Sequence, residues 1–509
     1  MNQSANNKRI ARNTLMLYFR HILILLISLF TVRVVLNTLG VTDYGVYNVI
    51  GGVVALFSFL RGTMASATQR FFSFALGEGD LKKLQSIFSV NLVIYVAIAV
   101  IAAILLETVG LWYVSDHLKI PPERYDAALS LYHFSVLTFI FNIIAAPFMA
   151  MIIAHEDMQI YAYVSIVEAI MKLSVVFMLV WAAGDKLIVY GFLVLLVSAI
   201  NTLLYAGIAL KKYEECQFKK FYWDRGLLKE ITSFTGWTLF GQLTTVFRGQ
   251  AVTILLNQFF NPVVVAARAI ASNITGQINV FSANFNTGIY PPIIKSYAAN
   301  DRQQMFSLIF NGSKMTFFLM WIFALPLFLE MDVILKIWLK TVPEGAVLFT
   351  RLALIESLIL SISMPITTAA RAPGKMREYE LILGSMQILI FILDLIVLKL
   401  GGQAYSVFVV AIIVNILMFI VRLMITHKLI SLKVYDFALR VMFPVLWISL
   451  LSSTLSYLLH ILLPEGLVYS IITITGSFIF SSIGMFYIGI NEVQRKKIIH
   501  TINKKIKRI

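Results

Sequence analysis

The sequence predicts an all-α polytopic membrane protein with about fourteen transmembrane helices. Three observations support this fold class. The 509 residues are 59% hydrophobic and only 13% charged, whereas about 25% of the residues in a soluble domain are charged. Apolar runs of roughly 18 residues or more, the length that crosses a ~30 Å hydrocarbon core, recur along the whole chain. Short connectors such as LGEGD, KIPPER and RAPGK separate these runs and carry turn-forming residues.

The expected spans follow one another closely, so the loops between them are short. The first apolar run is longer than a signal peptide, contains arginines and lacks a small-residue cleavage site, so we do not expect it to be cleaved. In chain order the expected spans lie at residues 13–38, 44–76, 86–113, 127–153, 158–183, 187–210, 230–257, 263–294, 303–329, 346–370, 377–399, 404–427, 436–463 and 466–490.

Lysine and arginine are unevenly divided between the two sides of this topology. The N-terminus, the even-numbered loops and the C-terminus carry about 26 of them, and the odd-numbered loops carry about six. The loop at 211–225 and the tail at 495–509 are the most basic segments. Because basic residues gather in cytoplasmic loops, both termini are expected in the cytoplasm. The same rule explains the net charge of +16. We expect the basic tail to contact anionic membrane lipids, and we expect no binding of nucleic acid.

Two pairs of segments indicate an internal repeat. VVLNTLGVTDYG (34–45) resembles ILLNQFFNPVVV (254–265), and GDLKKLQSIF (79–88) resembles NDRQQMFSLI (300–309). Both pairings have an offset of about 220 residues, so each repeat would hold six spans. A chance match between short apolar segments is the alternative interpretation.

An even number of spans per repeat preserves orientation, which predicts two six-helix lobes related by a pseudo-twofold axis along the membrane normal. We expect one lobe at residues 1–222 and the other at 223–430. Residues 431–509 would add two further spans and a basic cytoplasmic tail. Transporters built in this way bind their substrate between the halves and alternate its access.

The N-terminal part of the sequence carries a family resemblance. Residues 13–60 and the segment ATQRFFSFALGEGD (67–80) resemble the polysaccharide flippases of the multidrug/oligosaccharidyl-lipid/polysaccharide exporter superfamily. The pattern R-x-x-L-x-x-x-D-Y-G-x-Y of that family is kept loosely as RVVLNTLGVTDYGVY. The resemblance implies a flippase that moves a polyprenyl-pyrophosphate-linked oligosaccharide across the inner membrane of a bacterium, for surface polysaccharide or lipopolysaccharide biosynthesis. It also implies the polysaccharide assembly machinery as a partner.

About ten basic residues fall inside the expected spans, where charge costs ~3 kcal/mol or more. Some have a simple explanation. We expect Arg70 and Arg422 to snorkel from helix ends, and Lys172 to pair with Glu168 one helical turn away. Arg351 is expected to pair with Glu356. The basic residues that remain are Arg20, Arg33, Arg61, Arg248, Arg268 and Lys314.

Polar side chains form a stripe along the eighth span. Their spacing of 4, 3, 4, 3 and 4 places them on one face of a helix. They are Arg268, Ser272, Thr275, Asn279, Ser282 and Asn286. Small and polar residues also join membrane helices, but packing does not explain an arginine in the same stripe. We therefore predict a water-filled lumen, with helix packing as the alternative.

A cationic lumen would suit the anionic cargo that the resemblance implies. Arginine forks match phosphate oxygens, and hydroxyl and amide groups would meet the sugar. The expected substrate-binding residues are Arg20, Arg33, Arg61, Arg248, Arg268, Ser272, Thr275 and Asn279. For each arginine, snorkelling to the nearer membrane surface is the alternative.

Chemical motifs of enzymes are missing from the sequence. It lacks the ATP-binding pattern G-x-x-x-x-G-K-[ST] and metal-ligand spacing, so we expect no enzyme activity, cofactor or metal. Cys216 is the single cysteine, which excludes an intramolecular disulfide. HED (155–157) is interpreted as solvated or helix-capping residues.

Three other functions remain open. A multidrug/cation antiporter of the same superfamily needs acidic lumen residues, and the lumen arginines have no expected acidic partner. Asp394 in the eleventh span is the candidate ion-coupling residue for that function. A flippase for the peptidoglycan lipid precursor would differ only in its cargo. A membrane-bound oligosaccharide polymerase or ligase is disfavoured because the odd-numbered loops are short.

Overall fold

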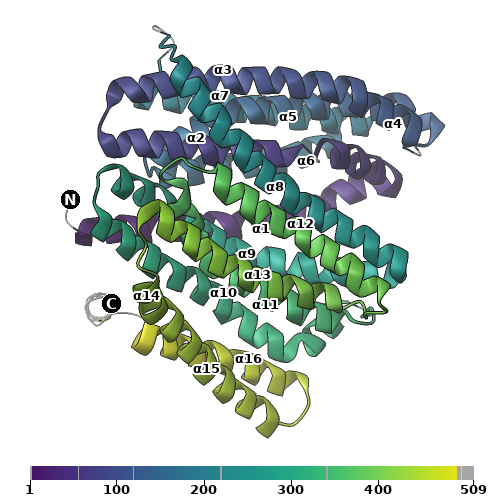
Figure 1. Cartoon of the computed structure of the whole chain (residues 1–509). Helices are drawn as coiled ribbons and strands as arrows, with labels where there is room; N and C mark the ends of the chain where they lie inside the picture. The colour runs from purple at the N-terminus through teal and green to yellow at the C-terminus, as the bar shows by residue number, and fades with distance from the viewer. Residues whose placement is uncertain are drawn as a thin grey trace, which may run out of the picture. The chain divides into compact units, whose positions relative to one another are not determined.

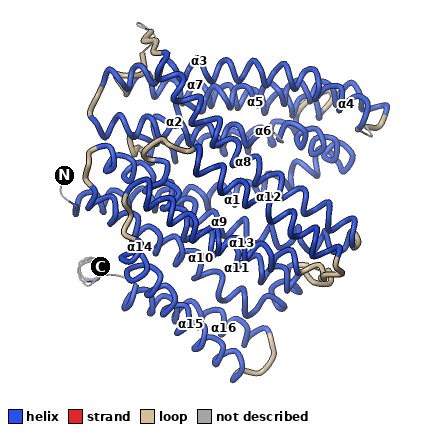
Figure 2. The backbone as a smooth tube through the Cα atoms, in the orientation of Figure 1, coloured by secondary structure: helices blue, strands red, loops and turns tan. Residues whose placement is uncertain are grey.

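The computed structural model describes residues 3–55, 57–118, 120–217, 221–339, 342–489 and residue 495. Within these ranges all regular structure is helical, as Figure 2 shows. The tail at 496–509, which we expect to contact anionic lipids, lies outside the described residues.

The chain divides into two compact units. One comprises Met1–Gln242 and Ile294–Asn300, and the other comprises Leu243–Ile293 and Asp301–Ile509. The helices, labelled in Figure 1, are α1 (Gln3–Ala55), α2 (Ser58–Glu78), α3 (Leu81–Leu105), α4 (Leu111–His117), α5 (Tyr125–Ala154), α6 (Met158–Trp181), α7 (Lys186–Lys212), α8 (Arg225–Phe259), α9 (Pro262–Ala298), α10 (Arg302–Trp338), α11 (Ala346–Arg371), α12 (Arg377–Lys399), α13 (Ser406–Ile430), α14 (Val434–Phe437), α15 (Phe443–Leu462) and α16 (Leu467–Gly484). The lobe boundaries expected at 222 and 430 stay predictions.

Ten of the described helical segments are long and apolar enough to cross a membrane, or eleven if the bent pair Asp43–Val54 and Phe59–Glu78 forms one span. The predicted all-α polytopic membrane fold is confirmed, but the count of fourteen spans is not. Each expected range does overlap a helix. Helices α8 and α9 are not among the ten, although they contain 35 and 37 residues, so polarity and not length sets them apart.

Helix α5 lies at the centre of the first unit. It packs against α2, α3 and α7, and these helices run beside it in Figure 1. Its buried residues include Tyr132, whose hydroxyl donates a hydrogen bond to the carbonyl of Leu106 at 2.5 Å. The buried hydroxyl is thereby satisfied inside an apolar helix bundle, where an unpaired donor would be costly.

Helix α1 is interrupted at Gly40. This residue has φ 80° and ψ 170°, so two helices meet here. A positive φ favours glycine because any side chain would add steric strain. The interruption places Asp43 at the start of the second helical part, where its carboxylate pairs with Arg124.

Two helix starts correspond across the predicted repeat. Asp80 caps α3 by accepting a hydrogen bond from the amide of Lys83. Asp301 caps α10 by accepting one from the amide of Gln304. Both acceptors satisfy a backbone donor that the first helical turn leaves open. The same local geometry thus recurs at the two segments that the predicted internal repeat pairs.

In the second unit, α11 packs against α10 and α13, and α15 and α16 pack against each other and against α10. The last two helices of the chain are therefore attached to this unit through α10. Lys314 of α10 is buried, and its Nζ donates to the carbonyl of Gly489 at 3.1 Å. This contact gives Lys314 a role in joining α10 to the end of the chain's last described helical segment.

Candidate functional site

Arg248 on α8 forms an ion pair inside the second unit. Its two terminal nitrogens donate to the same oxygen of Glu356 on α11, both at 3.0 Å. Asn415 on α13 donates to that oxygen too, also at 3.0 Å. The expectation that the lumen arginines lack acidic partners is therefore wrong for Arg248. The expected pair between Arg351 and Glu356 is wrong as well, since Glu356 is taken by Arg248.

Arg268 on α9 is held by neutral groups only. Its guanidinium donates to the hydroxyl of Thr253 and, at 3.1 Å, to the carbonyl of Gly249, both on α8. Among the described residues no carboxylate accepts a hydrogen bond from it. A guanidinium keeps its charge at any accessible pH, so Arg268 presents a positive charge that no bonded acid neutralises.

Asp394 on α12 completes this cluster. Its side chain is 1% exposed, and neither carboxylate oxygen has a hydrogen-bond partner among the described residues. It lies within electrostatic range of Arg248, Arg268 and Glu356. We call these four residues the mixed-charge cluster: two arginines and two acids, contributed by α8, α9, α11 and α12.

The remaining polar stripe of α9 differs from its arginine. Ser272 is exposed, and the buried hydroxyl of Thr275 donates back to the carbonyl of Ala271 within the helix. Asn279 donates to the hydroxyl of Ser357 on α11 at 3.2 Å. Ser282 donates to the carbonyl of Thr316 on α10 at 2.8 Å. Asn279 and Ser282 thus have partners on neighbouring helices, as the packing interpretation predicts.

The arginines of the first unit lie in different surroundings. Arg20 of α1 lies over the ring of Tyr161 on α6, with its guanidinium carbon 4.6 Å from the ring centre. Arg61 of α2 is partly exposed, makes no hydrogen bond or ion pair with a described residue, and lies within electrostatic range of Tyr95. The side chain of Arg33 lies outside the described residues.

Other charges expected inside spans have clear partners. Lys172 pairs with Glu168 at 2.7 Å, which confirms the prediction. Arg351 instead pairs with Asp332 at 2.9 Å. Arg70 is buried and does not snorkel as expected: its guanidinium lies near three phenylalanine rings and 3.5 Å from Glu230.

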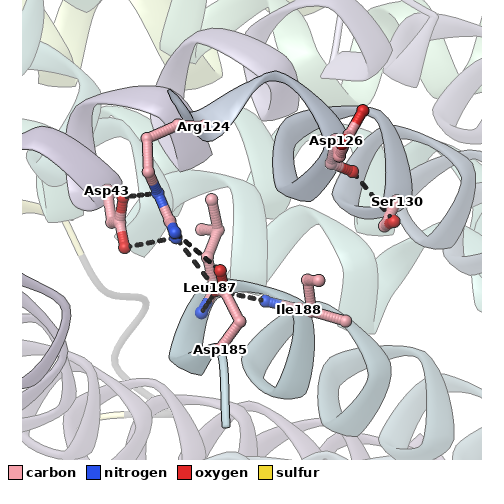
Figure 3. Close-up of polar contacts among 7 residues, drawn as sticks. All are labelled: Asp43, Arg124, Asp126, Ser130, Asp185, Leu187 and Ile188. Atoms are coloured by element: carbon pink, nitrogen blue, oxygen red, sulfur yellow. Dashed lines mark hydrogen bonds and ion pairs between the residues drawn. The ribbon is translucent and has the colours of Figure 1, made fainter. Parts of the chain in front are cut away.

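Arg124 forms a two-acid clamp at one end of the first unit, drawn in Figure 3. It lies in the short 3₁₀ turn η2 (Pro122–Arg124) before α5. The guanidinium donates to both oxygens of Asp43 at 2.7 Å and to the oxygens of Asp185 at 2.6 and 2.9 Å. The clamp therefore ties together the first, third and fifth predicted loops, which the predicted topology places on one side.

Asp185 also caps the N-terminus of α7. It accepts hydrogen bonds from the amides of Leu187 and Ile188. The hydrogen bonds from Arg124, together with the cap, hold the pKa of the Asp185 carboxyl below its usual range. The carboxylate form is therefore favoured by the folded structure.

Glu156, in the turn between α5 and α6, is the centre of a second network. Its φ is 64°, its side chain is 1% exposed, and it pairs with Lys295 of α9 at 2.8 Å. Its carbonyl accepts a hydrogen bond from Asn13 of α1 at 3.0 Å. A Cβ on Gly77 of α2 would lie 2.7 Å from the carbonyl oxygen of Lys295, so the helices are closely packed here.

The neighbours of Glu156 in the HED segment are also engaged. His155 contacts Glu215 and stacks on Tyr213. Asp157 accepts hydrogen bonds from Lys212 and from the hydroxyl of Tyr213. The interpretation of HED as solvated or capping residues is wrong for the buried Glu156. The only sequence signal was a run of three ionisable residues between two apolar spans.

Among the described residues there is no group of three or more histidine, cysteine, aspartate or glutamate side chains placed to hold a metal ion. Cys216 is buried and has no disulfide partner.

Solved structures with the same fold define the class of protein. A multidrug resistance MATE family transporter of the MOP superfamily in its outward-facing conformation is 13% identical, with a TM-score of 0.74; the match covers 84% of this chain and 97% of that one. A MATE protein in its bent conformation is also 13% identical, with a TM-score of 0.74, 85% of this chain and 97% of that one being covered. At such identity the likeness shows the fold alone.

A third structure with this fold is a MOP superfamily transporter from Pyrococcus furiosus Vc1, described as having a binding pocket of reverse polarity. It is 14% identical, with a TM-score of 0.68, and the match covers 84% of this chain and 96% of that one. The chain is thus a multi-pass membrane protein with the fold of MATE transporters.

The family follows from the sequence. The family model described as polysaccharide biosynthesis protein matches residues 10–297, more than half of the 509 residues. The chain therefore belongs to the polysaccharide biosynthesis protein family, and the predicted resemblance is confirmed. A search among curated proteins found no matching relative.

Proposed function

We propose that this protein is a flippase that moves a polyprenyl-pyrophosphate-linked oligosaccharide from the cytoplasmic to the periplasmic leaflet of a bacterial inner membrane. The observation that carries the proposal is the setting of Arg268. Its guanidinium is bonded to a hydroxyl and a carbonyl and to no described carboxylate. A charge inside a membrane protein that lacks a bonded counter-ion marks a site for an anionic partner.

A pyrophosphate group suits this site chemically. It is multiply charged, and its oxygens accept paired hydrogen bonds from the arginine fork. Arg61, which has no bonded acid among the described residues, is the corresponding candidate in the first unit. The family description, polysaccharide biosynthesis, supports a lipid-linked sugar as the cargo that carries the phosphate.

Alternating access would carry the cargo across, as in other transporters with repeated halves. Outward movement of an anion is favoured by an inside-negative potential, at ~2.3 kcal/mol per charge for 100 mV. In this proposal both termini face the cytoplasm, and the oligosaccharide is handed to the polysaccharide assembly machinery on the periplasmic side.

Asp394 supports a second candidate function, cation or drug antiport. A buried carboxylate without a hydrogen-bond partner among the described residues can bind a proton or a cation. In the flippase the same residue would couple an ion to transport. In an antiporter it would bind the exchanged cation, and the arginines would have only structural roles.

Full-length protein in proteoliposomes distinguishes these functions. A fluorescent polyprenyl-pyrophosphate-linked oligosaccharide is incorporated in both leaflets, and a membrane-impermeant quencher reports its movement to the outer one. The flippase proposal predicts faster movement than in protein-free liposomes and slower movement with Arg268→Ala. Uptake of a lipophilic cation that depends on Asp394, without movement of the glycolipid, would support the antiporter.

A further inference from the structure

The bonding of Glu356 is unusual for a glutamate paired with arginine. A guanidinium frequently matches two nitrogens to two carboxylate oxygens. Here both terminal nitrogens of Arg248 and the amide of Asn415 donate to Oε1. The described residues give no hydrogen bond to Oε2. The ion pair therefore uses one carboxylate oxygen. Glu356 binds Arg248 without forming the two parallel N–H···O hydrogen bonds that a guanidinium can make.

The mixed-charge cluster contains as many acids as arginines. Arg248, Arg268, Glu356 and Asp394 all lie within electrostatic range of one another. Only one of the arginines is bonded to an acid. At Arg268 an arriving anion would meet an arginine without a bonded acid, and on Arg248 it would compete with Glu356 for the two terminal nitrogens.

We propose that Glu356 is a displaceable counter-ion that exchanges with the cargo's pyrophosphate on Arg248. This inference rests on the proposed flippase function and concerns the regulation of the same site. When the site is empty, Glu356 holds Arg248. When the cargo arrives, its phosphate oxygens take the two nitrogens and release the carboxylate, and the carboxylate recaptures Arg248 as the cargo leaves.

Physical reasons favour such an exchange in a transporter. An arginine without a counter-ion is costly in a membrane, so the empty protein needs a partner for Arg248 while it returns to bind again. A phosphate bound by two unopposed arginines would also be released slowly. An internal competitor weakens binding, and it accelerates release because the departing phosphate is replaced within the site.

The position of Glu356 is compatible with displacement. Its side chain is 14% exposed and that of Arg248 is 18% exposed, so neither is sealed in the core. Asn415, by contrast, is 2% exposed and also donates to the carbonyl of Ala411 in its own helix. Asn415 is thus fixed and guides the carboxylate back to one place.

The test is the variant Glu356→Gln, which keeps the size of the side chain and removes its charge. Binding of geranylgeranyl pyrophosphate to the purified full-length protein is measured by calorimetry. Movement of the same lipid across proteoliposome membranes gives the rate. We expect about tenfold tighter binding and slower movement. Glu356→Asp, which keeps the charge on a shorter side chain, should fall between wild type and Glu356→Gln.

Two controls sharpen the result. Glu378→Gln removes a glutamate from an exposed ion pair with Lys428 on α12 and α13, and it should change neither quantity. When Arg248 is already replaced by alanine, Glu356→Gln should have no effect on binding. Glu356 and the phosphate then no longer compete for this arginine. A melting curve of each variant shows that it is folded.

The outcomes separate this inference from the proposed function. Weaker or unchanged binding in Glu356→Gln, with binding still dependent on Arg268, would overturn the exchange and leave the flippase proposal standing. If Glu356→Gln does not fold, unchanged binding in Glu356→Asp decides against the exchange in the same way. Absence of binding in the wild type, with no effect of Arg268→Ala on glycolipid movement, would reject both.

Discussion

Arg248 donates both of its terminal nitrogens to a single oxygen of Glu356, a residue 108 positions further along the chain. This pairing leaves Arg268 as the arginine of the mixed-charge cluster without a bonded acid among the described residues. We therefore propose different roles for Arg248 and Arg268 in binding the cargo. Arg268 attracts the anion, and Arg248 becomes available when Glu356 is displaced.

Removal of Arg268 should reduce transport strongly. We expect Arg268→Ala to lower the rate of glycolipid movement about tenfold or more, since charged hydrogen bonds contribute ~1.5–3 kcal/mol each. Arg268→Lys should keep part of the activity because an ammonium keeps the charge but not the fork. Arg61→Ala should also lower the rate. Proteoliposomes with equal amounts of folded protein provide the measurement.

Lys172→Ala is the matched control for the arginine variants. Lys172 also lies within a membrane span, but it is exposed and paired with Glu168, so its removal should leave transport unchanged. Normal transport by both Arg61→Ala and Arg268→Ala would show that neither arginine binds the phosphate of the cargo.

The Arg124 clamp predicts a dependence of stability on pH. Asp185→Asn keeps an oxygen that can cap α7 but loses the charge that faces Arg124. At pH 7 we expect a loss of about 1–2 kcal/mol, allowing for partial exposure of the clamp. Because the pKa of Asp185 is lowered in the folded protein, its contribution is complete above ~4, the unfolded pKa, and is lost as the pH falls through the folded value.

The difference in melting temperature between wild type and Asp185→Asn should therefore be largest near neutral pH and shrink on acidification below about 4. Asp126→Asn is the control, because Figure 3 shows Asp126 nearby with only its backbone carbonyl engaged, by Ser130. A difference that grows on acidification would contradict the assignment of the clamp.

The pair between Lys295 and Glu156 should be strongly coupled. Glu156 is almost fully buried, and removing one partner of a buried pair costs about 3–5 kcal/mol because a charge is left unpaired. We expect Glu156→Gln and Lys295→Met each to lower the melting temperature, and the double variant to recover part of the loss. Additive losses would show that the two residues act independently.

The pair between Lys428 and Glu378 serves as the reference for that cycle. Its side chains are 74% and 70% exposed, and exposed pairs contribute little to stability. Glu378→Gln, Lys428→Met and the double variant should each change the melting temperature only slightly.

Hydropathy alone predicted most of the helices, because a span of a given length must be apolar wherever it meets lipid. The matching segments of the predicted repeat contain Asp80 and Asp301, but the structure was needed to show that these residues cap helices. Local signals of this kind depend on neighbouring residues in the chain. Helices α8 and α9 overlap two of the expected spans, but they are too polar to be among the ten described helices that pass as membrane spans by length and composition.

Ion pairs across the fold could not be predicted in this way. The sequence offered Glu356 as a partner for Arg351, five positions away, whereas the structure gives Glu356 to Arg248. Pairing in a low-dielectric interior depends on distances between helices that are remote in the chain. The partners of Glu156 were hidden for the same reason, since Asn13 and Lys295 are both about 140 residues away.

The most direct test of the central claim is the sidedness of the lipid-linked oligosaccharide after deletion of the gene in its host. Our account predicts that complete, unpolymerised glycolipid accumulates in the inner leaflet, that the intact protein restores its export, and that Arg268→Ala does not. Normal crossing of the glycolipid, with a change only in sensitivity to drugs or cations, would contradict the flippase assignment and point to Asp394 instead.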